Sequence, residues 1–490
     1  MNRRNFLRTG LAGLGAAAAS AALSPLIKVR KASAATSPTG KGVIIVGIGG
    51  GLRLRESLGM AEGATMPNLF GTAPLISGFG TTAGAPRIAP EYAARMPALA
   101  LPAPRATPLY TQGTLITNLR YADGPPGHLQ GHGCLLSGFY NKLENRADAH
   151  LPVPTIFELH RREANAPATD AWYVSVIGGF YRALITSDHP AYGSRYAGVY
   201  LQPPGVMQPL APIIASGKRT LDLNTTNIVL PTIPSDPSED AAAAKLTKIL
   251  DGNTPAFASN DATVHLSADD NAQIQAHLAD IYSDPSYDKF FPKSFGIGLR
   301  NTKGTPDPAD DTIDATNDGR TIYHAERVLS RFRPSVMAIT LLDVDTCHTD
   351  FNGYLRAQQL ADAAVAHLWD TIQADPELRD TTTMIVMPEH GRHLFMNGVN
   401  TDSLGRSGID HGQGDNGDRD IWMLALGPDI KRNNVIAPTG ITQTGRGSGR
   451  YETIDAIMTA MNLLGHDTAM KSELTDYGAR PGLVVQEVMR

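Results

Sequence analysis

The sequence has 490 residues, of which 42% are hydrophobic, so it is ample for a packed globule but too long for one simple core. The formal net charge is −5 at pH 7. Residues 1–34 hold six basic side chains and no acids, so the chain without them carries −11. This charge argues against a nucleic-acid partner, which favours a basic surface.

The N-terminus has the parts of a twin-arginine export signal in their usual order. Arg3 and Arg4 precede Phe-Leu and a basic residue, a small apolar run covers 11–23, and an Ala-Ser-Ala cleavage site ends at Ala34. This run is too short for a membrane anchor, which needs roughly 20 residues. We expect residues 1–34 to be removed, the twin-arginine machinery to be a partner, and the mature chain to be periplasmic or secreted without a membrane span.

The mature chain is expected to begin with a buried strand. Residues 42–51 read as an apolar, β-branched run that enters a glycine cluster, which is typical of a central strand and a tight turn. The fingerprints of nucleotide-binding loops are absent there, so turn chemistry fits better than a phosphate cradle. A second strand is expected at 114–119.

His128 and His132 follow this second strand, where a helix N-terminus is predicted to face a ligand. They are four residues apart, so on a helix they share one face and have the spacing of metal ligands. Either could equally be a hydrogen-bonded structural histidine.

Helices and strands then alternate, which predicts an α/β fold with a mixed, mostly parallel sheet sandwiched by helices. The alternation weakens from about 178 to 320, and we interpret this part as a loop-rich insertion into a single domain of residues 42–490. The remaining expected helices lie at 155–163, 271–282, 322–332, 354–372 and 451–464, and the remaining strands at 172–177, 336–342, 384–387 and 421–426.

Three acidic-plus-histidine clusters lie in the last third of the chain, and two of them directly follow apolar runs. In open α/β sheets, ligands bind beyond the carboxyl ends of the strands, so the clusters are expected to converge. The first is Asp343-Val-Asp345-Thr-Cys-His348, the second is Glu389-His390-Gly-Arg392-His, and the third is Asp410-His411-Gly.

Carboxylates and neutral imidazoles are ordinary ligands of divalent metals, and three such clusters predict a site for one or two ions, with zinc or manganese favoured. Paired ions would clamp the oxygens of a displacement at phosphorus or sulfur. Arg392 is predicted to contact an oxyanion. The alternative is that these side chains only cap loops and turns. The predicted metal ligands are Asp345, His348, Glu389, His390 and His411, and the further candidates are Asp343, Asp410 and His132.

Cys134 and Cys347 are the two cysteines of the chain. Export permits a disulfide between them, but both lie inside candidate site motifs and two cysteines do not make a disulfide framework.

The order of these motifs resembles the alkaline phosphatase and sulfatase superfamily over most of the mature chain. Leu135-Leu-Ser-Gly138 resembles its Leu-Thr-Gly element, Glu389-His390-Gly resembles its Asp-His-Gly, and His411 resembles its last histidine. The pair Asp345 and His348 resembles its Asp–His pair. The likeness is closer to an uncharacterised, twin-arginine-exported bacterial branch, which shares short stretches such as Asp410-His411-Gly. The resemblance to the superfamily implies a metal-dependent α/β sandwich.

The sequence departs from the superfamily pattern in the N-terminal half. Gly49–51 replace the acid that follows the first strand, and His128 stands where a hydroxyl or thiol nucleophile is expected. We therefore expect a hydrolase of a phosphate or sulfate ester, with His128 and Arg392 as catalytic residues. Attack would come from a metal-activated water or from His128 itself. The alternative is a non-catalytic periplasmic metal-binding or assembly protein that retains the fold.

Overall fold

The structure is a computed structural model of the full chain. It describes residues 37–59, 65–77, 103–143, 149–175, 180–202, parts of 267–277, 297–300, 312–315, 317–348, 351–394, 409–412, 416–437 and 450–490. The predicted signal segment, much of the predicted insertion and residues 278–282 of an expected helix lie outside these ranges.

An eight-stranded sheet forms the centre of the described part, with the order β10-β2-β9-β8-β1-β7-β3-β4. The strand β9 is antiparallel to both β2 and β8, and the other pairings in this sheet are parallel. The predicted α/β class with a mixed, mostly parallel sheet is therefore confirmed. The strands are β1 (Gly42–Ile48), β2 (Thr114–Arg120), β3 (Ala171–Ser175), β4 (Val199–Leu201), β7 (Val336–Leu341), β8 (Thr382–Pro388), β9 (Asp420–Leu426) and β10 (Asn434–Ile436).

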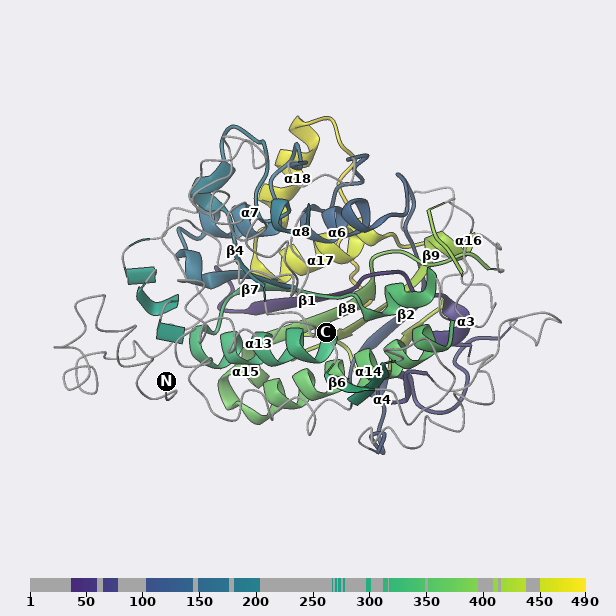
Figure 1. Ribbon diagram of the computed structural model, residues 1–490. Helices are drawn as coiled ribbons and strands as arrows, with labels where there is room; N and C mark the ends of the chain where they lie inside the picture. Colours follow the sequence, from purple (N-terminus) through teal and green to yellow (C-terminus); the bar gives the residue numbers. More distant parts are fainter. Residues whose placement is uncertain are drawn as a thin grey trace, which may run out of the picture.

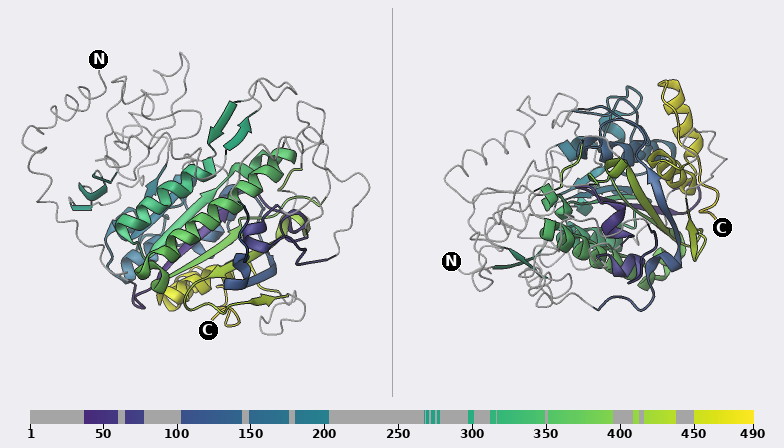
Figure 2. Two further views of the ribbon diagram at one scale, coloured as in Figure 1. Left: turned by 90° about the horizontal axis from the view of Figure 1, so that it is seen from below. Right: turned by 90° about the vertical axis from the view of Figure 1, so that its right-hand side faces the viewer.

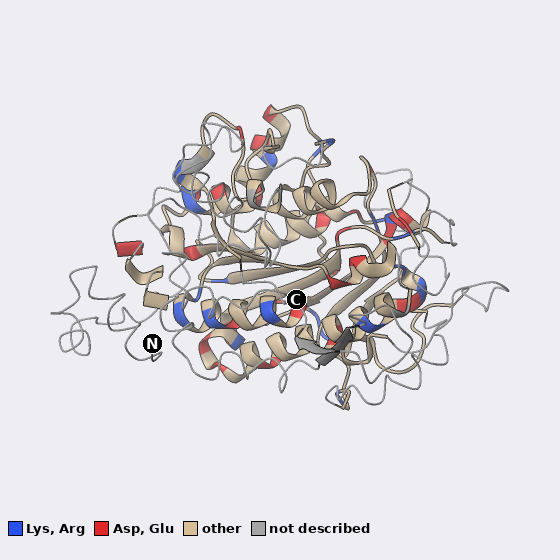
Figure 3. Cartoon of the chain, in the orientation of Figure 1, with Lys and Arg blue, Asp and Glu red and all other residues tan. Residues whose placement is uncertain are grey.

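The central strands β1, β7 and β8 are apolar along their whole length because helices cover both faces of the sheet. They contain no charged residue and are fully buried, as expected for parallel strands between two helical layers (Figure 3). Continuous apolar runs of this length made these strands readable in the sequence.

Figure 1 shows helices on both sides of the sheet. The long helices α13 (Asn317–Phe332) and α14 (Phe351–Ala374) lie side by side across one face, as the view from below in Figure 2 also shows. The other face is covered by α6 (His128–Ser137), α7 (Ile156–Glu163) and α17 (Thr453–Leu464), and α18 (Asp467–Asp476) packs on α17 and α7. The remaining described helices are α3 (Leu54–Ser57), α4 (Pro67–Phe70), η3 (Leu109–Gln112), η4 (Ala168–Asp170), α8 (Phe180–Ala183), η5 (Gly193–Tyr196), η7 (Asp343–His348), α15 (Pro376–Thr381) and α16 (Asn416–Arg419).

Parts of the predicted insertion at 178–320 belong to the core. The short strand β4 pairs with β3 at the edge of the main sheet, and α13 begins at Asn317, before the predicted helix start at 322. Within the same interval, β5 (Ile297–Arg300) and β6 (Thr312–Ala315) form a separate antiparallel pair.

Cys134 and Cys347 are both buried and both free, so they form no disulfide. Cys134 packs with Tyr121 and Ile454, whereas Cys347 belongs to the main hydrophobic core. Among the described residues, none of the helices combines the length and apolar character that crossing a bilayer requires.

Candidate metal centre

The carboxyl ends of the three central strands meet at one edge of the sheet. Ile48 at the end of β1 pairs with Leu341 of β7 on one side and with Pro388 of β8 on the other. The residues that follow these strands must therefore lie together. They are Gly49–51 after β1, the 3₁₀ turn η7 after β7, and residues 389–393 after β8. Helix α6 faces them from the next layer.

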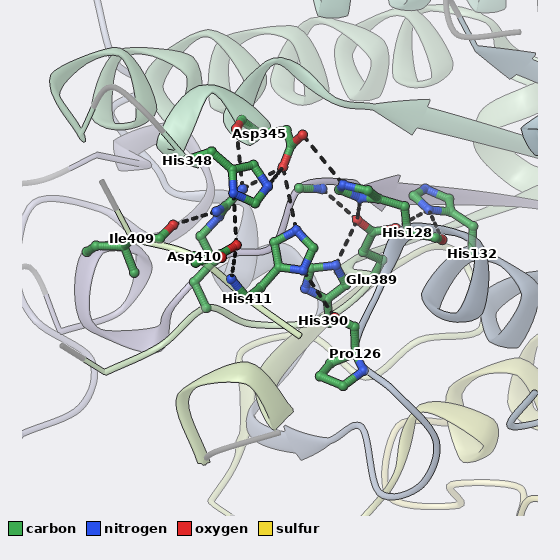
Figure 4. Close-up of polar contacts among 12 residues, drawn as sticks. Pro126, His128, His132, Asp345, His348, Glu389, His390, Ile409, Asp410 and His411 are labelled. Atoms are coloured by element: carbon green, nitrogen blue, oxygen red, sulfur yellow. Dashed lines mark hydrogen bonds and ion pairs between the residues drawn. The ribbon is translucent and has the colours of Figure 1, made fainter. Parts of the chain in front are cut away.

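The carboxylate of Glu389 is fully buried and surrounded by donors (Figure 4). Its Oε1 accepts hydrogen bonds from the backbone N–H of Gly50 (2.6 Å) and from Nδ1 of His128 (2.8 Å), and Nε2 of His390 lies 3.1 Å away. Its Oε2 contacts Nδ1 of His132. Both histidines of α6 therefore point at one carboxylate, as their spacing predicts.

Asp345 in η7 is the second carboxylate of the site. Nε2 of His348 lies 3.1 Å and Nε2 of His411 lies 3.7 Å from its Oδ1, and Nε2 of His128 lies 3.5 Å from its Oδ2. Arg392 completes the set with an ion pair of 2.6 Å to Oδ1. These side chains come from four separate segments of the chain, and Figure 4 shows the nitrogen atoms of His128, His348 and His411 turned toward the Asp345 carboxylate.

Three histidines are oriented by oxygen atoms on their outer side. Nδ1 of His348 lies 2.9 Å from Oδ1 of Asp410, Nδ1 of His390 lies 2.7 Å from the carbonyl of Gly391, and Nδ1 of His411 lies 3.1 Å from the carbonyl of Pro126. A carbonyl can only accept, so Nδ1 of His390 and of His411 must donate. This tautomer leaves a lone pair on Nε2, which is the arrangement found around metal-ligating histidines.

Two of these inward-facing atoms, Nε2 of His390 and Nε2 of His411, are buried and make no hydrogen bond. A buried polar atom without a partner is costly and calls for an explanation. A cation between this nitrogen and the nearby carboxylate would explain the missing hydrogen bond, because it would accept a lone pair from the nitrogen and one from the carboxylate oxygen.

The side chains divide into two groups of potential ligands. One is His128, Asp345, His348 and His411, and the other is His128, Glu389 and His390; in each group the ligand atoms lie within 4.8 Å of one another. Two ligands at about 2.1 Å from one cation lie roughly 3.0–3.4 Å apart at ordinary coordination angles. The observed separations of 3.1 Å, 3.5 Å and 3.7 Å around Asp345 are close to that value. The residues present therefore fit a divalent metal.

The two groups differ in their access to solvent. The side chains of Asp345 and His348 are 27% and 29% exposed, whereas those of Glu389 and His390 are completely buried. We call the first the open group and the second the sealed group. Catalytic metal sites keep an accessible position and structural sites are closed, and of these two groups only the open one is accessible.

The charges of the site are strongly coupled. Burial lowers the pKa of His128, but the carboxylates of Glu389 and Asp345 outweigh burial and raise it to about 10. Burial raises the pKa of Asp345 and of Glu389, but the surrounding histidines outweigh it and hold both well below the usual range. Burial, together with the nearby His390, lowers the pKa of His411 to about 4. The site thus keeps two carboxylates charged, one fully buried (Glu389) and one partly exposed (Asp345).

Gly50 and Gly51 show why no acid follows the first strand. Both have positive φ, +89° and +78°. A Cβ on Gly50 would lie 2.6 Å from the backbone nitrogen of Asp345, and a Cβ on Gly51 would contact the carbonyl of Gly391. Side chains cannot fit at either position. The glycine cluster is therefore a site of close backbone approach to the metal ligands.

The remaining predicted residues have supporting positions. Asp410 holds His348 and accepts the backbone N–H of His411. Asp343 turns away from the site and accepts hydrogen bonds from the side chain of Asn317 and the N–H of Asp318 at the start of α13. The oxygens of Asp343 therefore cap a helix, and Asp343 belongs to neither group of potential ligands.

Arg392 has a structural role in addition to the oxyanion contact that the sequence predicts, which stays a prediction. Its side chain is fully buried. Nη1 donates to the carbonyl of Ile409 (2.6 Å), and Nη2 donates to Asp345. It ties the segment that carries His411 to the turn that carries Asp345.

Sequence reasoning missed the backbone groups of the site. The N–H of Gly50 and the carbonyls of Pro126 and Gly391 orient ligands, but a backbone group leaves no signal in the residue types. Arg53 was also missed. It is buried in an ion pair with Glu56 and donates to the carbonyls of His393 and Leu394, just beyond the second cluster.

Neither a scan of family models nor a search of curated proteins found a match to this sequence. Solved structures do show distant similarity. A protein in the alkaline phosphatase superfamily from Vibrio parahaemolyticus is 12% identical, with a TM-score of 0.35 over 87% of this chain and 66% of that one. The lipoteichoic acid synthase LtaP from Listeria monocytogenes is 11% identical, with a TM-score of 0.35 over 89% and 73%. The phosphonate monoester hydrolase SpPMH from Silicibacter pomeroyi is 14% identical, with a TM-score of 0.33 over 86% and 72%. Likenesses this distant assign no activity to the chain.

Proposed function

We propose that the protein is an exported, metal-dependent hydrolase of a phosphate or sulfate ester, of the alkaline phosphatase and sulfatase type. One observation carries the metal part of this proposal. His390 and His411 each donate Nδ1 to a fixed carbonyl and turn a buried, unbonded Nε2 toward a carboxylate. The hydrolase part is supported by the order of the sequence motifs and by the open group at the carboxyl edge of the sheet. Residues 1–34 support export.

The open group would hold a cation through Asp345, His348 and His411, and the sealed group could hold another through Glu389 and His390. When bound, a zinc or manganese ion supplies Lewis-acid stabilisation of the charge that develops on phosphoryl or sulfuryl oxygens. The protein's part is to fix the ligands, and its outer bonds from Asp410, Gly391 and Pro126 do so.

Water is the nucleophile that this arrangement favours. Both ring nitrogens of His128 face carboxylates, at 2.8 Å and 3.5 Å, so neither is directed at a substrate. In the reaction the oxygen of one water bonds to phosphorus or sulfur, and the bond to the ester oxygen breaks. One proton of that water ends on the departing alcohol. The partly exposed side chains of Asp345 and His348 mark the side from which the substrate approaches.

Metal analysis and a substrate screen on protein exported with its own signal test this function. We expect at least one equivalent of zinc or manganese, recovery from the periplasm, and turnover of at least one class of phosphate or sulfate mono- or diester. His411→Ala should lower kcat/KM at least 100-fold and release the open-group metal, because it removes a ligand. His367→Ala, at a half-buried histidine on α14 outside both ligand groups, is the matched control and should change neither. A metal content below a tenth of an equivalent in the exported protein would contradict the proposal.

One observation favours a second candidate, a non-catalytic periplasmic binding or assembly protein. The backbone at Gly50 and Gly51 leaves no room for an acid, and a histidine takes the place of a hydroxyl or thiol nucleophile. In that case His411→Ala would lower the melting temperature of a protein that shows no turnover to begin with.

A further inference from the structure

We propose that His128 bridges two metal ions, with Nε2 serving the ion of the open group and Nδ1 serving the ion of the sealed group. The inference rests on the metal-dependent function proposed above and specifies how its site is built. It makes the imidazole ring a physical connection between an accessible ion and an enclosed one.

The position of the ring carries this inference. His128 is the member that the two ligand groups share. Its two nitrogens point in different directions: Nδ1 lies 2.8 Å from Oε1 of Glu389 in the sealed group, and Nε2 lies 3.5 Å from Oδ2 of Asp345 in the open group. The 3.5 Å separation exceeds the usual range of a hydrogen bond and is close to the distance between two ligands of one ion.

The two groups are built alike on either side of this ring. Each supplies one carboxylate, Glu389 or Asp345. Each also supplies one histidine whose Nδ1 is fixed by a carbonyl and whose buried Nε2 has no hydrogen bond, His390 or His411. One cation would satisfy the unbonded nitrogen on only one side. Two cations satisfy both, and each then needs a nitrogen of His128.

Helix α6 is shaped to place the ring there. His128 is its first residue, and the backbone of Gly127 before it is extended (φ −129°). One turn on, Gly131 faces Glu389, where a Cβ would lie 3.0 Å from the Cβ of Glu389. The absence of a side chain lets the helix approach closely enough for the ring to reach between the two carboxylates. His132 contacts the other oxygen of Glu389 and so fixes that carboxylate from the same helix.

Binding two ions to one imidazole displaces both ring protons, which pass to solvent, and no electron transfer is involved. The ions should differ in their rate of exchange, because the open group is exposed and the sealed group is not. A chelator is therefore expected to remove one equivalent quickly and the second slowly.

Metal stoichiometry and the magnetism of cobalt-substituted protein test the bridge. We expect two equivalents of Co²⁺ per chain at saturation and a magnetic moment below that of two independent ions. His348→Ala should leave one equivalent in the sealed group, and His390→Ala should leave one in the open group. His128→Ala should abolish the magnetic coupling and weaken both sites at least tenfold. His367→Ala, on α14 and outside both ligand groups, is the control and should retain two coupled ions.

One equivalent at saturation, two uncoupled ions, or coupling that persists in His128→Ala would each overturn the bridge. If His128→Ala does not fold, His128→Gly is saturated with free imidazole instead, and the coupling should return with the added ligand. These measurements need no substrate. Hydrolysis by a protein that binds a single ion would therefore reject the bridge and leave the proposed function standing.

Discussion

The histidines and carboxylates of this site are held by groups that residue type alone does not show. Gly50 donates its backbone N–H to Glu389 at 2.6 Å, and its backbone also passes directly against Asp345 in η7. The Glu389 carboxylate thus reaches the glycine turn that stands where the superfamily pattern has an acid. The arrangement of the site therefore depends on the free space around the backbone of Gly50.

Gly50→Ala tests this clearance. The variant must place a side chain at φ +89° and within 2.7 Å of Asp345. Left-handed strain costs roughly 1–2 kcal/mol and overpacking about 1–3 kcal/mol, so a loss of about 2–5 kcal/mol and weaker metal binding are expected. Gly40→Ala is the control, because Gly40 also has positive φ but nothing lies within 4 Å of its Cβ. Urea unfolding should show only the strain cost there, and equal losses in both variants would contradict the argument.

The segment after β8 is anchored by Arg53, the residue that precedes the short helix α3. Arg53 and Glu56 form an ion pair whose side chains are 2% and 0% exposed, with Nε of Arg53 2.8 Å from Oε2 of Glu56. The same guanidinium donates to the carbonyl of Leu394 at 2.7 Å, and Tyr354 on α14 accepts the N–H of Arg53. A charge pair thus joins three elements beside the site.

Arg53→Met should destabilise the protein by up to about 3–5 kcal/mol, because it leaves the buried Glu56 carboxylate with only the longer contact to Arg55, at 3.9 Å, as a counter-charge. Arg53→Met combined with Glu56→Leu removes that buried charge and should recover most of the loss. Urea unfolding of the two variants and the wild type measures the difference. A double variant no more stable than Arg53→Met would show that the loop contacts, and not the buried charge, dominate.

Buried histidines make the whole molecule sensitive to acid. Burial lowers the pKa of His324 to about 4, of His466 to about 4 and of His277 to about 3. An unfolded histidine has a pKa of about 6.5, so between that pH and about 4 the unfolded chain takes up protons that the folded chain cannot. Stability is therefore fully present above pH 6.5 and is lost as the pH falls.

His324→Gln should reduce this acid sensitivity. The stability difference between wild type and variant is expected to shrink by at most about 1.4 kcal/mol per pH unit between pH 6.5 and 4.5. Chemical unfolding in the presence of a chelator measures it without a contribution from metal loss. His367→Gln is the control. Its stability difference from the wild type should change with pH in the opposite direction, because a hydrogen bond to Glu326 raises the pKa of His367. A difference independent of pH for His324→Gln would contradict the prediction.

Much of the fold was readable because its pattern is local. The apolar runs of β1, β7 and β8 and the amphipathic face of α14 are periodic within a dozen residues, and their bounds agree with the sequence prediction to within a few positions. The antiparallel direction of β9 was not readable, since a strand has the same side-chain pattern in either direction. Nor was the assignment of β4 to the sheet edge, because its three residues are too few to show a period.

The types of potential ligand and their positions after the central strands are predictable from the residues alone, because a buried strand and the residue that follows it are encoded within one short segment. Other features follow only from the packed fold: which carboxylate meets which histidine, that Arg392 is enclosed, that Asp343 caps a helix, and that one ligand group is open and the other sealed. These features depend on contacts between residues far apart in the chain, such as the approach of His128 to Glu389 and Asp345. Such contacts are set by how layers pack and where backbone groups need partners, and no local pattern records them.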